Sequence, residues 1–159
     1  MRPRYVAASV AVLVIVAIFA YSLILDRLAT DENRIRTVIN TIVDSAEKRN
    51  LRKISGCLHA DFREEELDLD RRTTIDIMGR LFLTYPVIRA EVQGVNVKII
   101  DEATAEARFI GSASAARSPD SPGEELLRYR RSDRFLITFK KENGKWRIIR
   151  SRAARSTAD

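Results

Sequence analysis

The chain has 159 residues, of which 45% are hydrophobic and 31% are charged, and its formal net charge is +6. This length suits one domain with one core, once roughly 30 residues are set aside for an apolar opening segment and its flanks. The single cysteine, Cys57, excludes an intrachain disulfide, and one cysteine with one histidine, His59, provides too few ligands for a structural zinc site. We therefore expect no metal ion, no cofactor and a fold that is stabilised by packing.

The first predicted element is an apolar helix over Tyr5–Leu25, in which Ser9 and Ser22 are the weakly polar residues. At about 1.5 Å rise per residue, it spans the roughly 30 Å hydrocarbon core of a bilayer. A secretory signal usually has a shorter apolar region of about 7–15 residues, and the best cleavage position here, after Ala20, is followed by more apolar sequence. We favour an uncleaved anchor in contact with membrane lipid, with secretion after signal cleavage as the alternative.

The short tail before this segment indicates its orientation. Arg2 and Arg4 lie in that tail, and Lys and Arg residues resist translocation, whereas the charges on the other flank are mixed. We expect a signal anchor in the cell (inner) membrane, with the amino terminus in the cytoplasm and the domain on the periplasmic side. The predicted organisation is a cytoplasmic tail over residues 1–4, a transmembrane helix over 5–25, one domain over 26–153 and a disordered tail over 154–159.

Three helices are predicted at the start of the domain. Apolar residues of the first recur with the spacing of one helical stripe, at Ile35, Val38, Ile39, Ile42, Val43 and Ala46. Asn50 is expected to cap a short second helix, after which the chain leaves through His59–Phe62. Asp70 is expected to cap the third helix, which continues to Tyr85 and is ended by Pro86.

From Arg89 onward the apolar period changes to two, which predicts strands. The first strand continues to Ile99 with a bulge at Gly94, and the second covers Ala103–Ala115. A loop rich in turn residues, Ser118–Glu125, comes next.

A hairpin is predicted at the end of the domain. Its first strand alternates apolar side chains at Phe135, Ile137 and Phe139. Asn143-Gly144 then predicts a two-residue primed turn, because both residues tolerate positive φ. The last strand covers Lys145–Ser151.

The charges are unevenly distributed along the chain. Eleven Lys or Arg residues lie within residues 127–155, whereas residues 61–70 hold six acids. The basic strands favour a lipid or protein contact, and because no nucleic-acid motif accompanies them we expect no nucleic-acid partner. The acidic run is interpreted as a solvated loop, because it lacks the glycine turn and the regular ligand spacing of a calcium loop.

Helices followed by a meander of strands form an α+β plan, with the helices on one face of a curved sheet. Two stretches, EKRNLRKISGCLHADF and FLITFKKENGKWRII, carry a resemblance to a known family. Through these two stretches the chain resembles the nuclear transport factor 2-like superfamily, also called the polyketide-cyclase-like or ketosteroid-isomerase-like cone fold. The resemblance covers about residues 31–153. The resemblance implies a cystatin-like cone of three helices packed on a curved antiparallel sheet, and a homodimer formed through the sheet.

The resemblance also implies where catalytic groups would lie. Ketosteroid isomerase uses an acid as general base, and a Tyr and a protonated Asp as oxyanion donors. Alignment on the two stretches puts Glu66 near the base, but Ile42 and Phe135 at the positions of the donors. Losing one oxyanion donor costs roughly two to three orders of magnitude in rate, so Glu66 by itself would make a poor isomerase.

Other candidate residues carry weaker signals. His59 and Asp61 resemble the water-activating dyad of some dehydratases of this fold, so they are kept with Glu66 as candidate acids or bases. Glu106 and Arg108 point to the same strand face and would either line the pocket as an ion pair or lie on an exposed face. We favour a non-catalytic module that binds a small hydrophobic ligand or a protein of a membrane complex. The alternative is a pocket lyase or isomerase acting on a small hydrophobic molecule.

Overall fold

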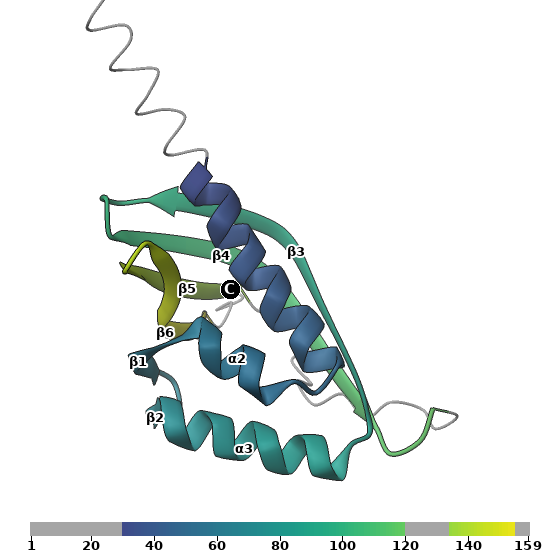
Figure 1. The fold of residues 1–159 in the computed structure, drawn as a ribbon. Coiled ribbons are helices and arrows are strands. Elements are labelled where there is room, and N and C mark those ends of the chain that lie inside the picture. Colours follow the sequence, from purple (N-terminus) through teal and green to yellow (C-terminus); the bar gives the residue numbers. More distant parts are fainter. Residues whose placement is uncertain (1–29, 120–133, 155–159) are drawn as a thin grey trace, which may run out of the picture.

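A computed structural model describes residues 30–119 and 134–154. A first helix occupies residues 30–47 of the described part, and two further helices follow, α2 (Leu51–Cys57) and α3 (Arg71–Thr84). The strands are β1 (Leu58–Glu64), β2 (Leu69–Asp70), β3 (Val87–Ile99), β4 (Thr104–Ala116), β5 (Arg134–Glu142) and β6 (Lys145–Ala154). In Figure 1 the first helix lies across the sheet, and α2 and α3 lie at the end of the domain farther from the start of that helix. The predicted α+β plan is therefore confirmed.

The strands form one six-stranded sheet in the order β2-β1-β6-β5-β4-β3. The prediction of an antiparallel sheet is wrong at one pair, because β1 runs parallel to β6 while the other neighbouring strands are antiparallel. Parallel neighbours need a long crossover connection, and here α3 and three long strands supply it. The segment His59–Phe62, expected to be the exit from a helix, belongs to β1. The sheet is mixed.

Local signals placed the helix caps and the tight turn correctly. The side chain of Asn50 accepts a hydrogen bond from the backbone N–H of Lys53 at 3.1 Å, and that of Asp70 accepts one from Thr73 at 2.7 Å. Asn143 has φ 51° and Gly144 has φ 74°, as a primed hairpin turn requires. These three predictions are confirmed, and they fix where the helices α2 and α3 begin and where β5 turns into β6.

The bulge predicted at Gly94 is also present. The pairing of β3 with β4 shifts between Gln93 and Asn96, and Gly94 has φ 64°. The first helix contacts β3 within this bulge and before it: Arg36 Nη1 donates to the carbonyl oxygen of Val95 at 2.9 Å, and Glu47 Oε1 accepts from the N–H of Ala90 at 3.2 Å. Since β3 is an edge strand, these contacts satisfy backbone groups that would otherwise face solvent.

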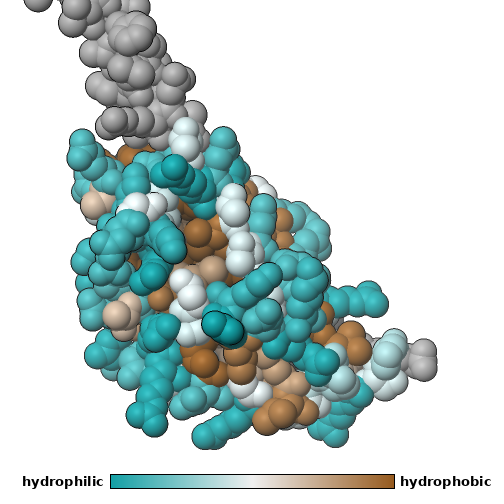
Figure 2. Space-filling model, in the orientation of Figure 1, coloured by the Kyte–Doolittle hydropathy of each residue, from teal (hydrophilic) through white to brown (hydrophobic). Residues whose placement is uncertain are grey.

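The core lies between the first helix and the sheet. Its buried side chains include Ile35 and Ile39 from the helix, and from the strands Leu58, Phe62, Ala105, Ala107, Ile137, Phe139, Trp146 and Ile148. A second cluster joins α2, α3, the start of β3 and the end of β4 through Ile54, Phe82, Ile88 and Ala115. Figure 2 shows that this side of the molecule is mostly hydrophilic, with hydrophobic surface gathered toward the lower end, near α2 and α3.

The amino-terminal end of the described helix is attached to the β5–β6 hairpin. The Asp31 carboxylate accepts hydrogen bonds from Lys141 Nζ at 2.7 Å and from Trp146 Nε1 at 3.0 Å. Burial by itself would raise the pKa of Asp31, but the two hydrogen bonds and the charges of Lys141 and Arg34 outweigh it and hold the pKa below its ordinary value. This contact fixes the helix that follows the predicted anchor on the sheet.

Several predicted segments lie outside the described residues. They are the anchor Tyr5–Leu25 with its flanks, most of the loop Ser118–Glu125, and the tail after residue 154. Within residues 30–119 and 134–154, no helix combines the length and apolar character needed to span a membrane.

Candidate functional site

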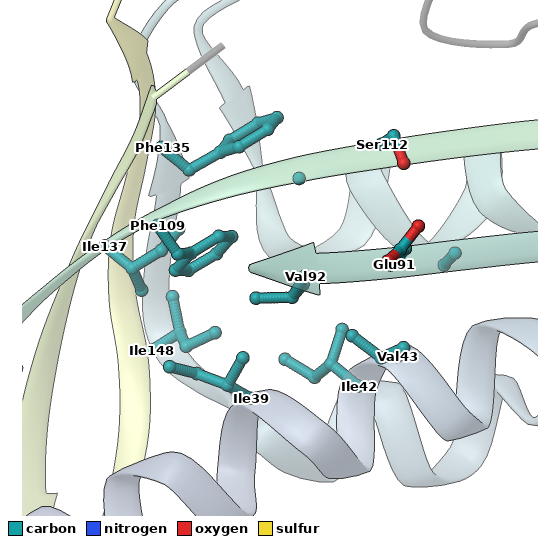
Figure 3. Close-up of a pocket in the computed structure, with 12 residues that line it drawn as sticks. Ile39, Ile42, Val43, Glu91, Val92, Phe109, Ser112, Phe135, Ile137 and Ile148 are labelled. Atoms are coloured by element: carbon teal, nitrogen blue, oxygen red, sulfur yellow. The ribbon is translucent and has the colours of Figure 1, made fainter. Parts of the chain in front are cut away.

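A pocket of about 190 Å³ lies between the first helix and the sheet (Figure 3). The helix contributes Ile39, Ile42 and Val43, which the 3–4 residue spacing brings to one side. The strands contribute Val92, Phe109, Phe135, Ile137 and Ile148, with Ala90, Glu91, Gly111 and Ser112 completing the lining. Phe109 and Gly111 on β4, and Phe135 and Ile137 on β5, are alternate residues that face the helix, so this part of the wall is continuous with the hydrophobic core.

A glycine makes room for the aromatic wall of the pocket. Phe109 and Phe135 stack with ring centroids 5.6 Å apart and ring planes inclined by 24°. A Cβ atom on Gly111 would lie 3.1 Å from Cε2 of Phe135, which is closer than ordinary van der Waals contact. The absence of a side chain at Gly111 therefore allows the Phe135 ring to lie over β4.

The interior of the pocket offers little acid–base chemistry. Of the described residues that line it, Glu91 and Ser112 have polar side chains, and both residues are exposed. They are paired across β3 and β4, and Glu91 Oε1 accepts a hydrogen bond from Gln93 Nε2 at 2.7 Å. Neighbouring residues of a strand point to opposite faces. Glu91, which precedes Val92, and Ser112, which follows Gly111, therefore point away from the apolar interior. The arrangement suits apolar binding.

Two of the candidate acids lie outside the pocket. Glu66 is exposed in the turn between β1 and β2, where its backbone N–H donates to Glu64 Oε1 at 3.1 Å. Asp61 lies on β1 with its side chain 80% exposed. Neither residue lines the pocket, so the structure does not bring them together with the stacked rings.

His59 is buried, with 3% of its surface exposed, but it also lies outside the pocket lining. Its Nδ1 accepts the backbone N–H of Asp61 at 3.1 Å and lies 3.6 Å from Asp61 Oδ2, while its Nε2 lies 3.7 Å from Glu142 Oε2. Within the described part of the chain, Nε2 has no hydrogen-bond partner. His59 and Asp61, which were predicted to act together, are thus in contact. They lie in the first half of β1 and do not line the apolar pocket.

Ile42 and Phe135, which the resemblance put at the positions of the oxyanion donors, both line the pocket (Figure 3). They come from facing elements, the first helix and β5. Aliphatic and aromatic hydrocarbon side chains at these two positions provide no hydrogen bond to a developing oxyanion.

Glu106 and Arg108 lie on the other face of the sheet. Their neighbours on β4, Ala105 and Ala107, are fully buried beneath the first helix, and alternation turns Glu106 and Arg108 outward. Neither residue lines the pocket between helix and sheet, so of the two placements that the sequence left open, the structure has the outer sheet face. Phe109, the next residue along β4 after Arg108, lines the pocket. Arg108 lines a separate hollow on the outer face.

Sequence reasoning assigned most of the pocket residues to the core. The helical stripe and the strand alternation identified Ile39, Val92 and Phe109 as inward-facing residues, but periodicity does not distinguish a filled core from a cavity wall. Gly111 was the available signal, because a glycine within a strand often marks close packing of another group. Among the described residues, His, Cys, Asp and Glu side chains do not gather into a group of three or more able to hold a metal ion.

Comparisons with known proteins place the fold. No family model matches the chain, and no curated protein matches it. A proposed scytalone dehydratase from Novosphingobium aromaticivorans is similar in structure, with a TM-score of 0.70 and 11% identity over 80% of this chain and 85% of that one. A proposed dehydratase of the NTF2-like (nuclear transport factor 2-like) family from Streptomyces avermitilis gives a TM-score of 0.62 and 12% identity over 82% and 99% of the two chains.

An uncharacterised protein with a cystatin-like fold from Caulobacter vibrioides gives a TM-score of 0.59 and 15% identity over 79% of this chain and 90% of that one. Similarity at such low identity is evidence of a shared fold, and a fold alone does not determine function. The described part of the chain therefore has the NTF2-like, cystatin-like α+β fold, a cone of three helices on a mixed sheet.

Proposed function

We propose that this chain is a single-pass membrane protein whose NTF2-like domain is a non-catalytic binding module. Its pocket takes a small hydrophobic ligand, or one apolar side chain of a partner in a membrane complex. The observation that carries this proposal is the apolar lining of the pocket, together with the location of Glu66, Asp61 and His59 outside it.

The size of the pocket limits what it can take. An engineered apolar cavity of about 150 Å³ in another protein stays dry and binds benzene, and this pocket measures about 190 Å³. Many sites for drug-sized ligands are larger, at about 300–1,000 Å³. A single ring or a short branched chain is therefore the size of group that fits.

The lining also argues against catalysis in the pocket. Transition-state stabilisation needs donors or charges aimed at the reacting atoms, and one missing oxyanion donor costs about 10²–10³ in rate. The resemblance puts Ile42 and Phe135 at the positions of the oxyanion donors, and both residues have hydrocarbon side chains that donate no hydrogen bond. The pocket would therefore bind a ligand mainly through burial of apolar surface, which contributes about 25 cal/mol of binding free energy per Å².

Toluene binding tests the pocket. In the full-length chain with labelled isoleucine methyl groups, toluene should shift the methyl resonances of Ile39, Ile137 and Ile148 saturably. The variant Ile42→Trp fills the pocket with an indole, so we expect it to weaken binding at least tenfold or abolish it. The matched control is Ile77→Trp, because Ile77 is exposed on α3 and lies outside the pocket lining.

The proposal fails if toluene shifts no pocket methyl in the unmodified chain. It also fails if Ile42→Trp, with its remaining methyl resonances still dispersed as in a folded protein, binds toluene as tightly as Ile77→Trp does.

Membrane attachment is the second part of the proposal, and it is supported by the length and apolar composition of Tyr5–Leu25. We propose that the amino terminus is in the cytoplasm of the cell and the domain lies on the periplasmic side of the inner membrane. The full-length chain should stay in the membrane pellet after alkaline carbonate extraction, and a variant lacking residues 5–25 should not. Alkaline phosphatase fused after residue 159 should be active, because it matures only outside the cytoplasm. An inactive but intact fusion would overturn the orientation.

A second candidate function is a lyase or isomerase. Two of the similar solved structures are proposed dehydratases, and the buried His59 contacts Asp61 in this chain. Since neither residue lines the pocket, a lyase or isomerase reaction at His59 and Asp61 would require the substrate to bind beside the first half of β1. Turnover of a small cyclic alcohol that is lost in both His59→Asn and Asp61→Asn, but not in Asp44→Asn, would favour it over the binding module.

A further inference from the structure

The outer face of the sheet, away from the first helix, has a second hollow of about 610 Å³. Three arginines from three neighbouring strands line it: Arg108 on β4, Arg134 on β5 and Arg152 on β6. Ile110 and Leu136 provide apolar surface between them. The hollow therefore combines a cationic rim with a hydrophobic floor.

The register of the strands explains why the three arginines meet. Arg108 lies beside Leu136, and Leu136 lies beside Arg152, while Arg134 precedes Leu136 by two residues on the same face and lies beside Ile110. Adjacent strands are about 4.8 Å apart, so the Cα atoms of Arg108 and Arg152 are separated by roughly 10 Å. Long, unbranched arginine side chains reach a common point across that distance.

Two of these three charges are not neutralised within the described part of the chain. Arg108 and Arg134 are exposed, and neither side chain has a hydrogen-bond or ion-pair partner among residues 30–119 and 134–154. Arg152 Nε lies 4.0 Å from Glu65 Oε2, at the limit of an ion pair, and Glu65 also contacts Arg150. Glu106 precedes Arg108 by two residues on the same face of β4, and it is paired with Lys98 of β3. The hollow keeps an excess of positive charge.

We infer that this hollow binds a small molecule that carries a phosphate or carboxylate group on an apolar body. Guanidinium groups pair with both kinds of oxyanion through two parallel hydrogen bonds, and three of them line one hollow. The exposed side chain of Ile110 offers the apolar body a surface to cover. The volume lies within the range of small-molecule sites.

The homodimer expected through the sheet would cover this same face, but a second copy of the chain fits it less well than an anion does. A symmetric pairing of the outer faces would bring the same arginines of the two copies together, and like charges across an interface are unfavourable. Phe109 and Phe135 border both cavities, but the hollow is lined by Arg108, Arg134 and Arg152, whereas Ile39 and Ile42 line only the pocket between helix and sheet.

Phenyl phosphate is the probe for this site, with the full-length chain in a neutral detergent. We expect saturable binding by calorimetry, a shift of the Ile110 methyl resonance, weaker binding as salt rises, and tighter binding than inorganic phosphate alone. Arg108→Gln and Arg134→Gln should each weaken binding about tenfold or more, since a hydrogen bond to a charged group is lost. Arg80→Gln removes the same charge from an exposed position on α3 and should leave the affinity unchanged.

Ile42→Trp separates the two sites, because it should abolish toluene binding and leave phenyl phosphate binding intact. The inference is overturned if neither phenyl phosphate nor benzoate binds saturably, or if inorganic phosphate binds as tightly as phenyl phosphate. It is also overturned if Arg80→Gln weakens binding as much as Arg108→Gln, or if Ile42→Trp removes phenyl phosphate binding.

Discussion

Replacing Phe139 with alanine should lower the free energy of unfolding by about 3–5 kcal/mol, the range for truncating a buried aromatic side chain. Phe139 is 0% exposed and is the largest fully buried side chain of the described residues. It lies in the cluster that joins the first helix to β4, β5 and β6. Its removal takes away apolar contacts and leaves a cavity that rigid neighbours fill only partly. Since a typical domain is stable by about 5–15 kcal/mol, this loss is a large part of the total.

Urea unfolding followed by fluorescence measures this effect, because Trp146 is the single tryptophan of the chain and is buried. Leu83→Ala is the control: Leu83 is 88% exposed on α3, and we expect a change within about 0.5 kcal/mol. If the two variants have the same unfolding midpoint, the core between helix and sheet is not packed as described.

Replacing Asp31 with asparagine should lower the free energy of unfolding by about 1.5–3 kcal/mol near neutral pH. The Asp31 side chain is 13% exposed and lies 2.7 Å from Lys141 Nζ. Asparagine retains an oxygen that can accept from Trp146 Nε1 but loses the charge that pairs with Lys141. The matched control is Asp44→Asn, because the exposed ion pair of Asp44 with Lys48 should contribute less than about 1 kcal/mol.

The effect of Asp31→Asn should depend on pH. The folded-state pKa of Asp31 is held below its ordinary value, so the unfolded chain binds this proton at higher pH than the folded chain does. The stability that Asp31 contributes is complete above the unfolded pKa of about 3.9 and is lost as pH falls through the folded-state pKa. The difference between the unmodified chain and Asp31→Asn should therefore be constant from pH 5 to pH 7 and shrink below about pH 4. A difference that stays constant down to pH 2 would show that the charge of Asp31 has no role.

This contact bears on the proposed function because it lies between the predicted anchor and the pocket. Asp31 attaches the described start of the first helix to the β5–β6 hairpin, and Ile39 and Ile42 of the same helix line the pocket. A rigid attachment at Asp31 would hold the pocket-lining side of the first helix in a fixed position on the sheet. Phe139→Ala and Asp31→Asn thus test the support of the site, while Ile42→Trp tests the site itself.

The features that the sequence determined by itself are local. The stripe of Ile35, Ile39 and Ile42 lies on one side of a helix because a helix repeats every 3.6 residues, whatever it packs against. The caps at Asn50 and Asp70 depend on hydrogen bonds to residues three positions away. The turn at Asn143-Gly144 depends on two φ angles. Each of these signals is complete within a few residues, so each could be predicted correctly.

The features that only the tertiary structure decided depend on residues far apart in the sequence. The strand β1 was not predicted, because its burial does not alternate regularly and its parallel partner β6 is supplied from the other end of the domain. The partners of Asp31 are 110 and 115 residues away, and a carboxylate does not indicate in the sequence which cation it will meet. Alternation showed that Glu106 and Arg108 share a face, but only the packing of the first helix over Ala105 and Ala107 decided that this face is the outer one. The pocket and the arginine hollow were decided in the same way, since their residues come from several strands whose register is fixed by long-range pairing.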